Sequence, residues 1–133
     1  MIAPVHVTEL DIRWGDLDAY DHVNNATYLT LIEEARLQWF RTFEGGWRTA
    51  VAEPVVARTE VNYRRALHHP ARVRVELRVE KIGRTSMAVS HRIVDALAPD
   101  VLHSDGLTVV VWVDPAGSRP VPLPDNVRRA ALA

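Results

Sequence analysis

Residues 24–43 read NNATYLTLIEEARLQWFRTF, and this stretch carries the strongest helical pattern in the chain. Its apolar residues recur at the spacing of one helix face: Tyr28, Ile32, Ala35 and Trp39, joined by Leu29, Leu31, Phe40 and Phe43. Asn24 or Asn25 can cap the start of the helix, and Gly45 and Gly46 are typical of a helix end. The pattern predicts a helix of about 17 residues with one wide apolar face.

The sequence after this helix is rich in strands. In RVRVELRVE (72–80), four apolar residues alternate with charged ones, which predicts a strand with one buried and one solvated face. Its neighbours are VVARTEVNYR (55–64), TSMAVSHRIV (85–94) and LTVVVWV (107–113). The last is apolar on both faces, so we expect it to be central or covered by a partner subunit. Before the helix, a first strand is indicated by Val5, Val7, Leu10 and Ile12, with an irregularity between Val7 and Leu10.

These elements predict an α+β fold in which an antiparallel sheet wraps around one long helix. A helix of about 17 residues spans roughly 25 Å, which is about the width of five strands. The chain ends with RPVPLPDN (119–126), where Asp125 or Asn126 can cap a short terminal helix. Because one helix covers only one face, edge strands remain to be paired, and we expect at least a homodimer.

Composition limits the classes of function. The chain of 133 residues has a formal net charge of −1 with acids and bases interspersed, which argues against nucleic acid or a membrane surface as the partner. The N-terminal segment alternates like a strand, so we expect neither a signal peptide nor a transmembrane helix, and a cytoplasmic location. The absence of cysteine excludes a thiol nucleophile, a disulfide frame and a thiolate zinc site.

The segment RWGDLDAYDHVNN (13–25) places Asp16, Asp18, Asp21 and His22 just before the predicted helix. A helix start presents unpaired backbone N–H groups and the positive end of a macrodipole, which attract anions and polarised carbonyl oxygens. The N–H groups near Asn25 can therefore hold a carbonyl oxygen while Asp18 attacks the carbonyl carbon or activates a water that does. Asp16 is better explained as a turn or capping residue.

The stretch RWGDLDAYDHVNNATYLTLIEEAR (13–36) resembles the hot-dog-fold acyl-CoA thioesterases, in particular the 4-hydroxybenzoyl-CoA thioesterase-like family. The shared pattern is an aromatic residue, Gly, Asp, any residue and Asp, followed by a His/Val/Asn-rich turn and a Tyr-Leu helix start. The resemblance implies one hot-dog thioesterase domain over residues 1–133, with Asp18 as the active-site carboxylate and the Asn25 N–H polarising the thioester carbonyl. No metal or organic cofactor is implied.

His22 is a further catalytic candidate, because it lies where plant acyl-carrier-protein thioesterases with a similar HVNN stretch place a functional histidine. Those enzymes have an asparagine where this chain has Tyr20. Tyr28 either packs in the core or lines the acyl pocket. In KIGRTS (81–86), the donors of Arg84, Thr85 and Ser86 resemble a segment that contacts the nucleotide in hot-dog enzymes. Further candidates for binding phosphate are Arg64, Arg65 and Arg72.

The expected function is hydrolysis of a small or medium acyl-CoA, or acyl carrier protein, thioester to a carboxylic acid and a free thiol by a homodimer or homotetramer. Two alternatives remain: a hot-dog dehydratase or lyase, and a non-catalytic acyl-CoA binding module. A calcium loop is excluded, because Tyr20, Asp21 and Thr27 occupy positions that need other residues. Serine hydrolysis by Ser86 or Ser90 lacks the G-x-S-x-G elbow, and His91 falls on an apolar strand face that is typical of a core histidine.

Overall fold

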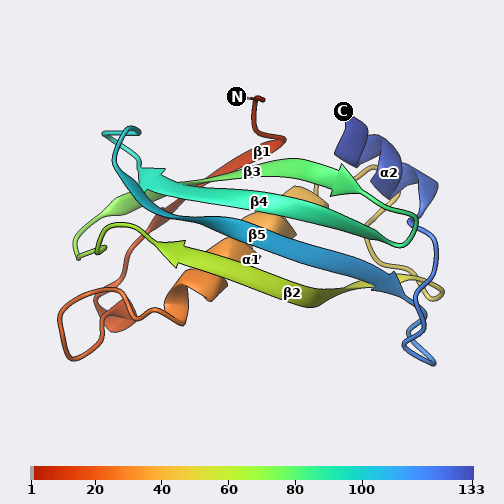
Figure 1. Ribbon diagram of the computed structural model, residues 1–133, viewed down its shortest axis with the longest axis horizontal. Helices are drawn as coiled ribbons and strands as arrows, with labels where there is room; N and C mark the ends of the chain where they lie inside the picture. The colour runs from red at the N-terminus through yellow and green to blue at the C-terminus, as the bar shows by residue number, and fades with distance from the viewer. Residues whose placement is uncertain (1) are drawn as a thin grey trace.

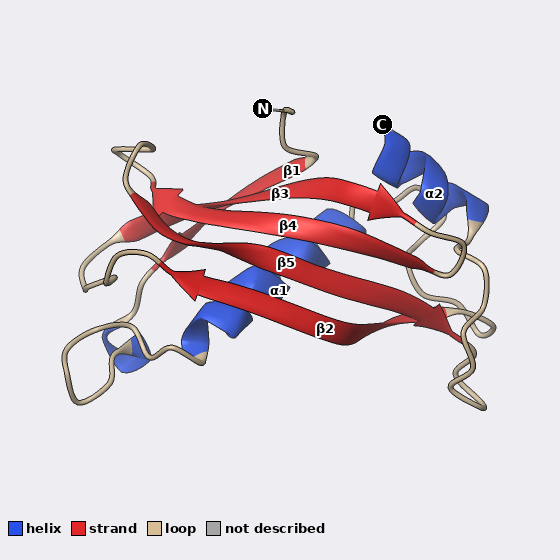
Figure 2. Ribbon diagram, in the orientation of Figure 1, coloured by secondary structure: helices blue, strands red, loops and turns tan. Residues whose placement is uncertain are grey.

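A five-stranded antiparallel sheet curves over one long helix in the computed structural model, which describes residues 2–133 (Figure 1). The strands lie in the order β1-β3-β4-β5-β2, with the bounds β1 (His6–Asp11), β2 (Glu53–Tyr63), β3 (Arg72–Ile82), β4 (Ser86–Asp95) and β5 (Leu102–Val113). Helix α1 (Thr27–Phe40) crosses one face of the sheet, and the shorter α2 (Asp125–Leu132) lies near one end of it (Figure 2). The predicted α+β architecture is confirmed. Neither helix has the length and hydrophobicity that a membrane span requires.

Alternation along the strands decides which side chains form the core. In β3, Val73, Val75 and Leu77 are buried, while the charged residues between them lie on the opposite face. Strand β5 lies between β4 and β2, inside the sheet, as its apolar character on both faces predicted. Its Trp112 is completely buried and contacts Phe40 of α1, with the ring centroids 5.8 Å apart.

Strand β1 differs from the prediction in one respect. It pairs with β3 without any shift of register from His6 to Asp11, so the predicted irregularity between Val7 and Leu10 is wrong. The inward positions are Thr8, Leu10 and Ile12. Thr8 is buried despite its hydroxyl, because that hydroxyl donates a hydrogen bond to Gln38 Oε1 of α1 at 3.2 Å. A polar residue at an inward position therefore made a regular strand look irregular in the sequence.

The ends of the two helices also need correction. Helix α1 has 14 residues and ends at Phe40, before the glycines, and the chain then turns through Gly45 and Gly46, each with φ of +87°. Helix α2 begins after Pro124, and no side chain caps it, so neither predicted cap is correct. Asn126 instead donates hydrogen bonds from its side chain to the carbonyl oxygens of residues 44 and 46.

The antiparallel register defines two ends of the sheet. At one, which we call the Tyr63 end, β1 and β2 finish, β3 begins and α1 starts. At the other, the Gly83 end, β3 turns into β4, β2 begins and α2 lies close by (Figure 1). The sequence cluster that precedes α1 lies at the Tyr63 end.

His91 lies on the inward face of β4, as the sequence predicted, and is 1% exposed. Its Nε2 is 3.2 Å from Ser104 Oγ, whereas its Nδ1 has no hydrogen-bond partner among residues 2–133. Burial lowers the pKa of His91 to about 4, against a smaller opposing effect of the Asp105 charge. The imidazole is therefore neutral in the folded protein at pH 7.

This burial makes folding stability sensitive to acid. In the unfolded chain, a histidine takes up a proton near pH 6.5, whereas folded His91 does so only near pH 4. Above pH 6.5 the histidine is neutral in both states and does not change the free energy of unfolding. As the pH falls from 6.5 toward 4, only the unfolded chain gains the proton, which lowers the free energy of unfolding by about 3 kcal/mol in total. We expect a His91→Gln variant to be less stable at pH 7 but to lose correspondingly less stability on acidification. Urea unfolding of both proteins between pH 7 and 4.5 measures this, and parallel pH profiles would contradict it.

Candidate active site

Asp16 braces the loop between β1 and α1. A short 3-10 turn covers Trp14–Asp16, and both carboxylate oxygens of Asp16 accept hydrogen bonds from Arg13, from its backbone N at 2.8 Å and from its Nη2 at 2.7 Å. Burial alone would raise the pKa of Asp16, but these hydrogen bonds, with the charges of Arg13 and His69, hold it below its ordinary value. Asp16 is 4% exposed, and it has the structural role that its position predicted.

Asp18 lies in a tight turn that is closed by a bridge between Leu17 and Val23. Its backbone N donates to His22 O at 2.8 Å, and its Oδ1 accepts a hydrogen bond from Tyr20 N at 2.8 Å. Asp21 completes the turn with φ of +61°. The other carboxylate oxygen of Asp18 has no hydrogen-bond partner among the described residues, so it is available to a ligand.

The start of α1 leaves one backbone donor unused. Asn24 Oδ1 accepts a hydrogen bond from Ala26 N at 2.8 Å, and Asn24 O accepts one from Thr27 N at 2.9 Å. The N-cap residue of α1 is Ala26 and no side chain caps the helix, so the predicted cap at Asn24 or Asn25 is wrong. Asn24 instead closes the turn just before the helix. The Asn25 N–H has no partner within residues 2–133, while the Asn25 carbonyl accepts a hydrogen bond from Tyr63 Oη at 2.8 Å. This contact ties the helix start to the end of β2.

A hollow of about 290 Å³ joins these groups, and we call it the Asp18 hollow. It is lined by Asp18, His22, Asn25 and Tyr28, which the sequence predicted, and by Tyr63 and Arg65, among others. Tyr28 is 3% exposed, and its ring meets that of Tyr63 edge to face at 4.9 Å. Burial, followed by the charge of Tyr63, raises the pKa of Tyr28, so its phenol keeps its proton at neutral pH. Tyr28 is thus both a core residue and a wall of the hollow.

His22 lies at the exposed rim of the hollow. Its ring packs edge to face against that of His68, with centroids 5.1 Å apart, and His68 Nδ1 lies 3.3 Å from Asp21 O. His22 lines the same hollow as Asp18, whose backbone N–H donates a hydrogen bond to His22 O at 2.8 Å. In the part of the chain that the structure describes, no three His, Asp or Glu side chains are grouped to hold a metal ion.

Arg84, Thr85 and Ser86 lie at the Gly83 end, and one copy of the chain does not bring them to the Asp18 hollow (Figure 1). Their backbone carbonyls hold neighbouring segments: Arg84 O accepts a hydrogen bond from Leu123 N at 3.0 Å, and Thr85 O accepts one from Trp112 N at 2.9 Å. Arg128 of α2 also donates to Gly83 O at 3.0 Å. These contacts fix the turn between β3 and β4 in place.

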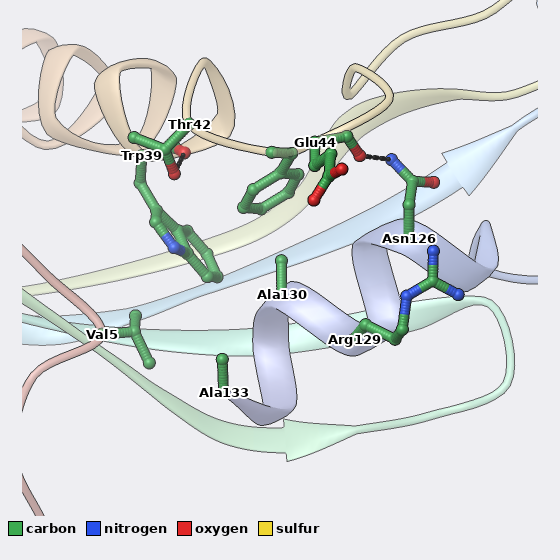
Figure 3. Close-up of a pocket in the computed structure, with 9 residues that line it drawn as sticks. Val5, Trp39, Thr42, Glu44, Asn126, Arg129, Ala130 and Ala133 are labelled. Atoms are coloured by element: carbon green, nitrogen blue, oxygen red, sulfur yellow. Dashed lines mark hydrogen bonds between the residues drawn. The ribbon is translucent and has the colours of Figure 1, made fainter.

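A second hollow, of about 380 Å³, lies between the end of α1 and α2 (Figure 3). Its walls include Trp39, Ala130 and Val5, with Glu44 and Arg129 at its edge. No residue predicted to be functional lines it. It is the larger of the two, but only the Asp18 hollow combines a carboxylate with the unpaired amide of a helix start.

Sequence reasoning missed Tyr63 as a site residue and gave no geometric reason for Arg65. Both follow from the place where β2 ends. A strand that closes with NYRR (62–65) must deliver a tyrosine and two arginines to one end of the sheet, which is a usable signal once the strand order is known. The strand order could not be predicted from local sequence patterns, because β2 pairs with β5. The last residues of β2 pair with residues that follow them by more than forty positions in the sequence.

Two solved structures of other proteins share this fold over nearly the whole chain. The PA2801 protein of Pseudomonas aeruginosa is 38% identical, with 98% of this chain and 99% of that chain covered and a TM-score of 0.90. A thioesterase from Thermus thermophilus, solved in complex with coenzyme A and Zn, is 34% identical, with 98% and 100% covered and a TM-score of 0.82.

A shorter match is found to the long-chain acyl-CoA thioesterase FadM of Escherichia coli strain K12. It is 43% identical over 61 residues, which are 44% of this chain and 46% of that protein, so the match spans less than half of that relative. Residues 12–131 match the sequence pattern that defines the thioesterase-like superfamily. The chain therefore belongs to the thioesterase-like superfamily and has the hot-dog fold that its sequence predicted.

Proposed function

We propose that this protein is an acyl-CoA thioesterase that hydrolyses a small or medium acyl-CoA, or acyl carrier protein, thioester to a carboxylic acid and a thiol. The observation that carries the proposal is that the Asp18 carboxylate and the Asn25 amide line one hollow at the start of α1. Each has an atom without a partner in residues 2–133. The names of FadM and of the Thermus thioesterase, which was solved with coenzyme A, support the same activity.

The chemistry needs an electrophilic carbon held between these two groups. The Asn25 N–H donates a hydrogen bond to the thioester carbonyl oxygen, and the positive end of the α1 dipole stabilises the charge that grows there. Asp18 then either attacks the carbonyl carbon, giving an acyl-enzyme anhydride that water cleaves, or removes a proton from the attacking water. In both routes the C–S bond breaks and the thiolate leaves with the pantetheine arm.

The remaining walls suggest how the substrate is oriented. Tyr28 and Val23 are buried and form the apolar side of the hollow, which suits the acyl group. His22 is exposed at the rim, where its imidazole can deliver a proton to the leaving thiolate. The thiol side of the substrate then points toward solvent.

We also propose that the protein acts as a homodimer or homotetramer, with β2 paired to β2 of a second copy. Val55 and Val56 of this edge strand are 43% and 49% exposed. Arg36 of α1 is 8% exposed, yet it has no hydrogen bond or ion pair with any described residue. Burial lowers its pKa, and the charge of Glu33 offsets this only in part. A second copy that supplies an acceptor would give this guanidinium a partner.

Such pairing also bears on Arg84, Thr85 and Ser86. Two antiparallel β2 strands place the Gly83 end of one copy on the same side as the Tyr63 end of the other. The predicted nucleotide contacts would then come from the second copy. Light scattering tests the assembly, because a mass equal to the 15.0 kDa of one chain would reject it.

Release of free thiol from a panel of thioesters tests the proposed activity. Purified protein is mixed with aromatic, short-chain, medium-chain and long-chain acyl-CoA at equal concentration, and thiol is followed with a colorimetric reagent. We expect catalytic turnover of at least one small or medium substrate. Saturable binding without thiol would instead identify a binding module, and a change in the acyl chain without thiol would identify a dehydratase or lyase.

A further inference from the structure

Tyr63 is the last residue of β2, and its side chain reaches the start of α1. It lies on the inward face of the sheet, as the side chain of Val61 does two residues earlier. The hydroxyl donates a hydrogen bond to Asn25 O at 2.8 Å, and the ring meets that of Tyr28 edge to face, with an interplanar angle of 84°. Although Tyr63 is 50% exposed, these two contacts fix the direction of its phenol.

The Asn25 carbonyl depends on this phenol. In a regular helix it would accept a hydrogen bond from Leu29 N, four residues on, but Leu29 N donates to Ala26 O at 3.1 Å. No other residue that the structure describes donates to Asn25 O. The peptide between Asn25 and Ala26 is therefore held by Tyr63 on its carbonyl side and, through the Ala26 N–H, by Asn24 Oδ1 at 2.8 Å.

The end of β2 is itself locked to β5. Asp105 Oδ1 accepts hydrogen bonds from Asn62 Nδ2 at 3.1 Å and from Arg64 Nη2 and Nε at 3.0 and 3.2 Å. Asn62 and Arg64 flank Tyr63 along the chain, and their side chains lie on the opposite face of the sheet. The backbone of Tyr63 is thus fixed by β5, and its hydroxyl ties the start of α1 to this fixed point.

Two physical effects connect the contact to the amide that we assign to the thioester oxygen. The N–H and the carbonyl of Asn25 belong to one residue, so a carbonyl that is held in place limits the directions that the N–H can take. The phenol proton also offsets the partial negative charge of the carbonyl oxygen, which would otherwise repel the charge that grows on the thioester oxygen. Both effects favour the transition state more than the bound substrate.

We propose that Tyr63 is a positioning residue of the thioester reaction. Its phenol holds the Asn25 peptide so that the N–H points to the place where the carbonyl oxygen gains negative charge. Tyr63 acts through Asn25 and does not touch the reacting atoms. This inference rests on the proposed thioesterase function, and it adds the end of β2 to the parts of the chain on which the rate depends.

Tyr63→Phe tests the proposal, because phenylalanine keeps the ring and its contact with Tyr28 and removes only the hydroxyl. We expect kcat with the best acyl-CoA to fall roughly 10- to 100-fold, the effect of a misplaced oxyanion donor, while KM stays within about twofold of wild type. The midpoint of urea unfolding should stay close to that of wild type. A wild-type kcat in Tyr63→Phe would reject the positioning role.

Two inhibitors separate positioning from a purely structural role. One is a trifluoromethyl ketone carried on coenzyme A, whose carbonyl carbon takes up a nucleophile and then bears an oxyanion. The other is an S-alkyl coenzyme A, which has no carbonyl. Tyr63→Phe should raise the inhibition constant of the ketone by about the factor that it removes from kcat, and should leave that of the S-alkyl compound unchanged. An equal rise for both inhibitors would show that Tyr63 shapes the binding surface, and would overturn the proposal.

Thr30→Val provides the control for loss of a hydroxyl near the start of α1. Thr30 is exposed, and its hydroxyl has no hydrogen bond with any described residue. This variant should keep the wild-type kcat and both inhibition constants. A fall in kcat as large as that of Tyr63→Phe would mean that any disturbance of the helix start slows the reaction, and the assignment to the phenol would be wrong.

The backbone amide of Asn25 reports on the contact without any turnover. In ¹⁵N-labelled protein, its NMR signal should shift in Tyr63→Phe and stay in place in Thr30→Val. An unshifted signal in Tyr63→Phe would overturn the positioning role whatever the activity. The proposed function fails separately, when the wild-type protein releases no thiol from any thioester of the panel. Thiol release by the wild type together with an unshifted Asn25 signal in Tyr63→Phe would reject the role of Tyr63 alone.

Discussion

Replacing Asp18 with asparagine should lower kcat for thioester hydrolysis by about 100- to 10,000-fold, the range for loss of a positioned acid-base or nucleophilic group. Asparagine keeps the Oδ1 that accepts the hydrogen bond from Tyr20 N at 2.8 Å, so the turn should survive. What disappears is the negative charge of the carboxylate, which both proposed routes require. Steady-state rates with the best acyl-CoA from the thiol-release panel measure the loss.

Asp21→Asn is the matched control for this variant. Asp21 belongs to the same turn, is exposed, and has φ of +61°, a conformation that asparagine tolerates. We expect both variants to unfold within about 0.5 kcal/mol of wild type, because neither removes a buried contact. Only Asp18→Asn should lose activity. If Asp18→Asn turns over thioester at the wild-type rate, the carboxylate is not part of the chemistry.

The local part of this site could be predicted from the sequence, because its elements are close together along the chain. Asp18, His22 and Asn25 lie within eight residues, and the helical pattern that follows them fixes where the unpaired amides are. In the structure, these three residues and Tyr28 line one hollow.

The remaining parts depend on long-range pairing, which local patterns do not encode. Tyr63 reaches the helix start only because β2 is the edge strand next to β5. Arg84 lies at the opposite end, because β3 runs away from the site before it turns into β4. Thr8 shows a different limit of local patterns: its polar side chain, hydrogen-bonded to Gln38 of α1, interrupts the apolar alternation without interrupting the strand.

Gly106 is the other residue whose importance only the structure reveals. It lies within β5, where glycine is normally unfavourable, and faces the inward side between Val61 of β2 and His91 of β4. A Cβ atom at this position would lie 2.0 Å from the backbone oxygen of Glu60 and 2.7 Å from Cε1 of His91. The first of these contacts is with backbone, which cannot move without separating the strands.

Gly106→Ala should therefore lower the free energy of unfolding by about 3 kcal/mol or more, at the upper end of what overpacking costs in a core. The pairing of β2 with β5 would have to open near the residues that lead to Tyr63 and Arg65, so the variant should also lose activity at temperatures where it remains folded.

Gly15→Ala is the control, because a Cβ there meets no atom within 4 Å, and it should unfold within about 0.5 kcal/mol of wild type. Urea unfolding of the three proteins measures both effects. Equal stability of Gly106→Ala and Gly15→Ala would mean that the close packing of Glu60, Gly106 and His91 can relax, and that this glycine does not hold the end of β2 in its place.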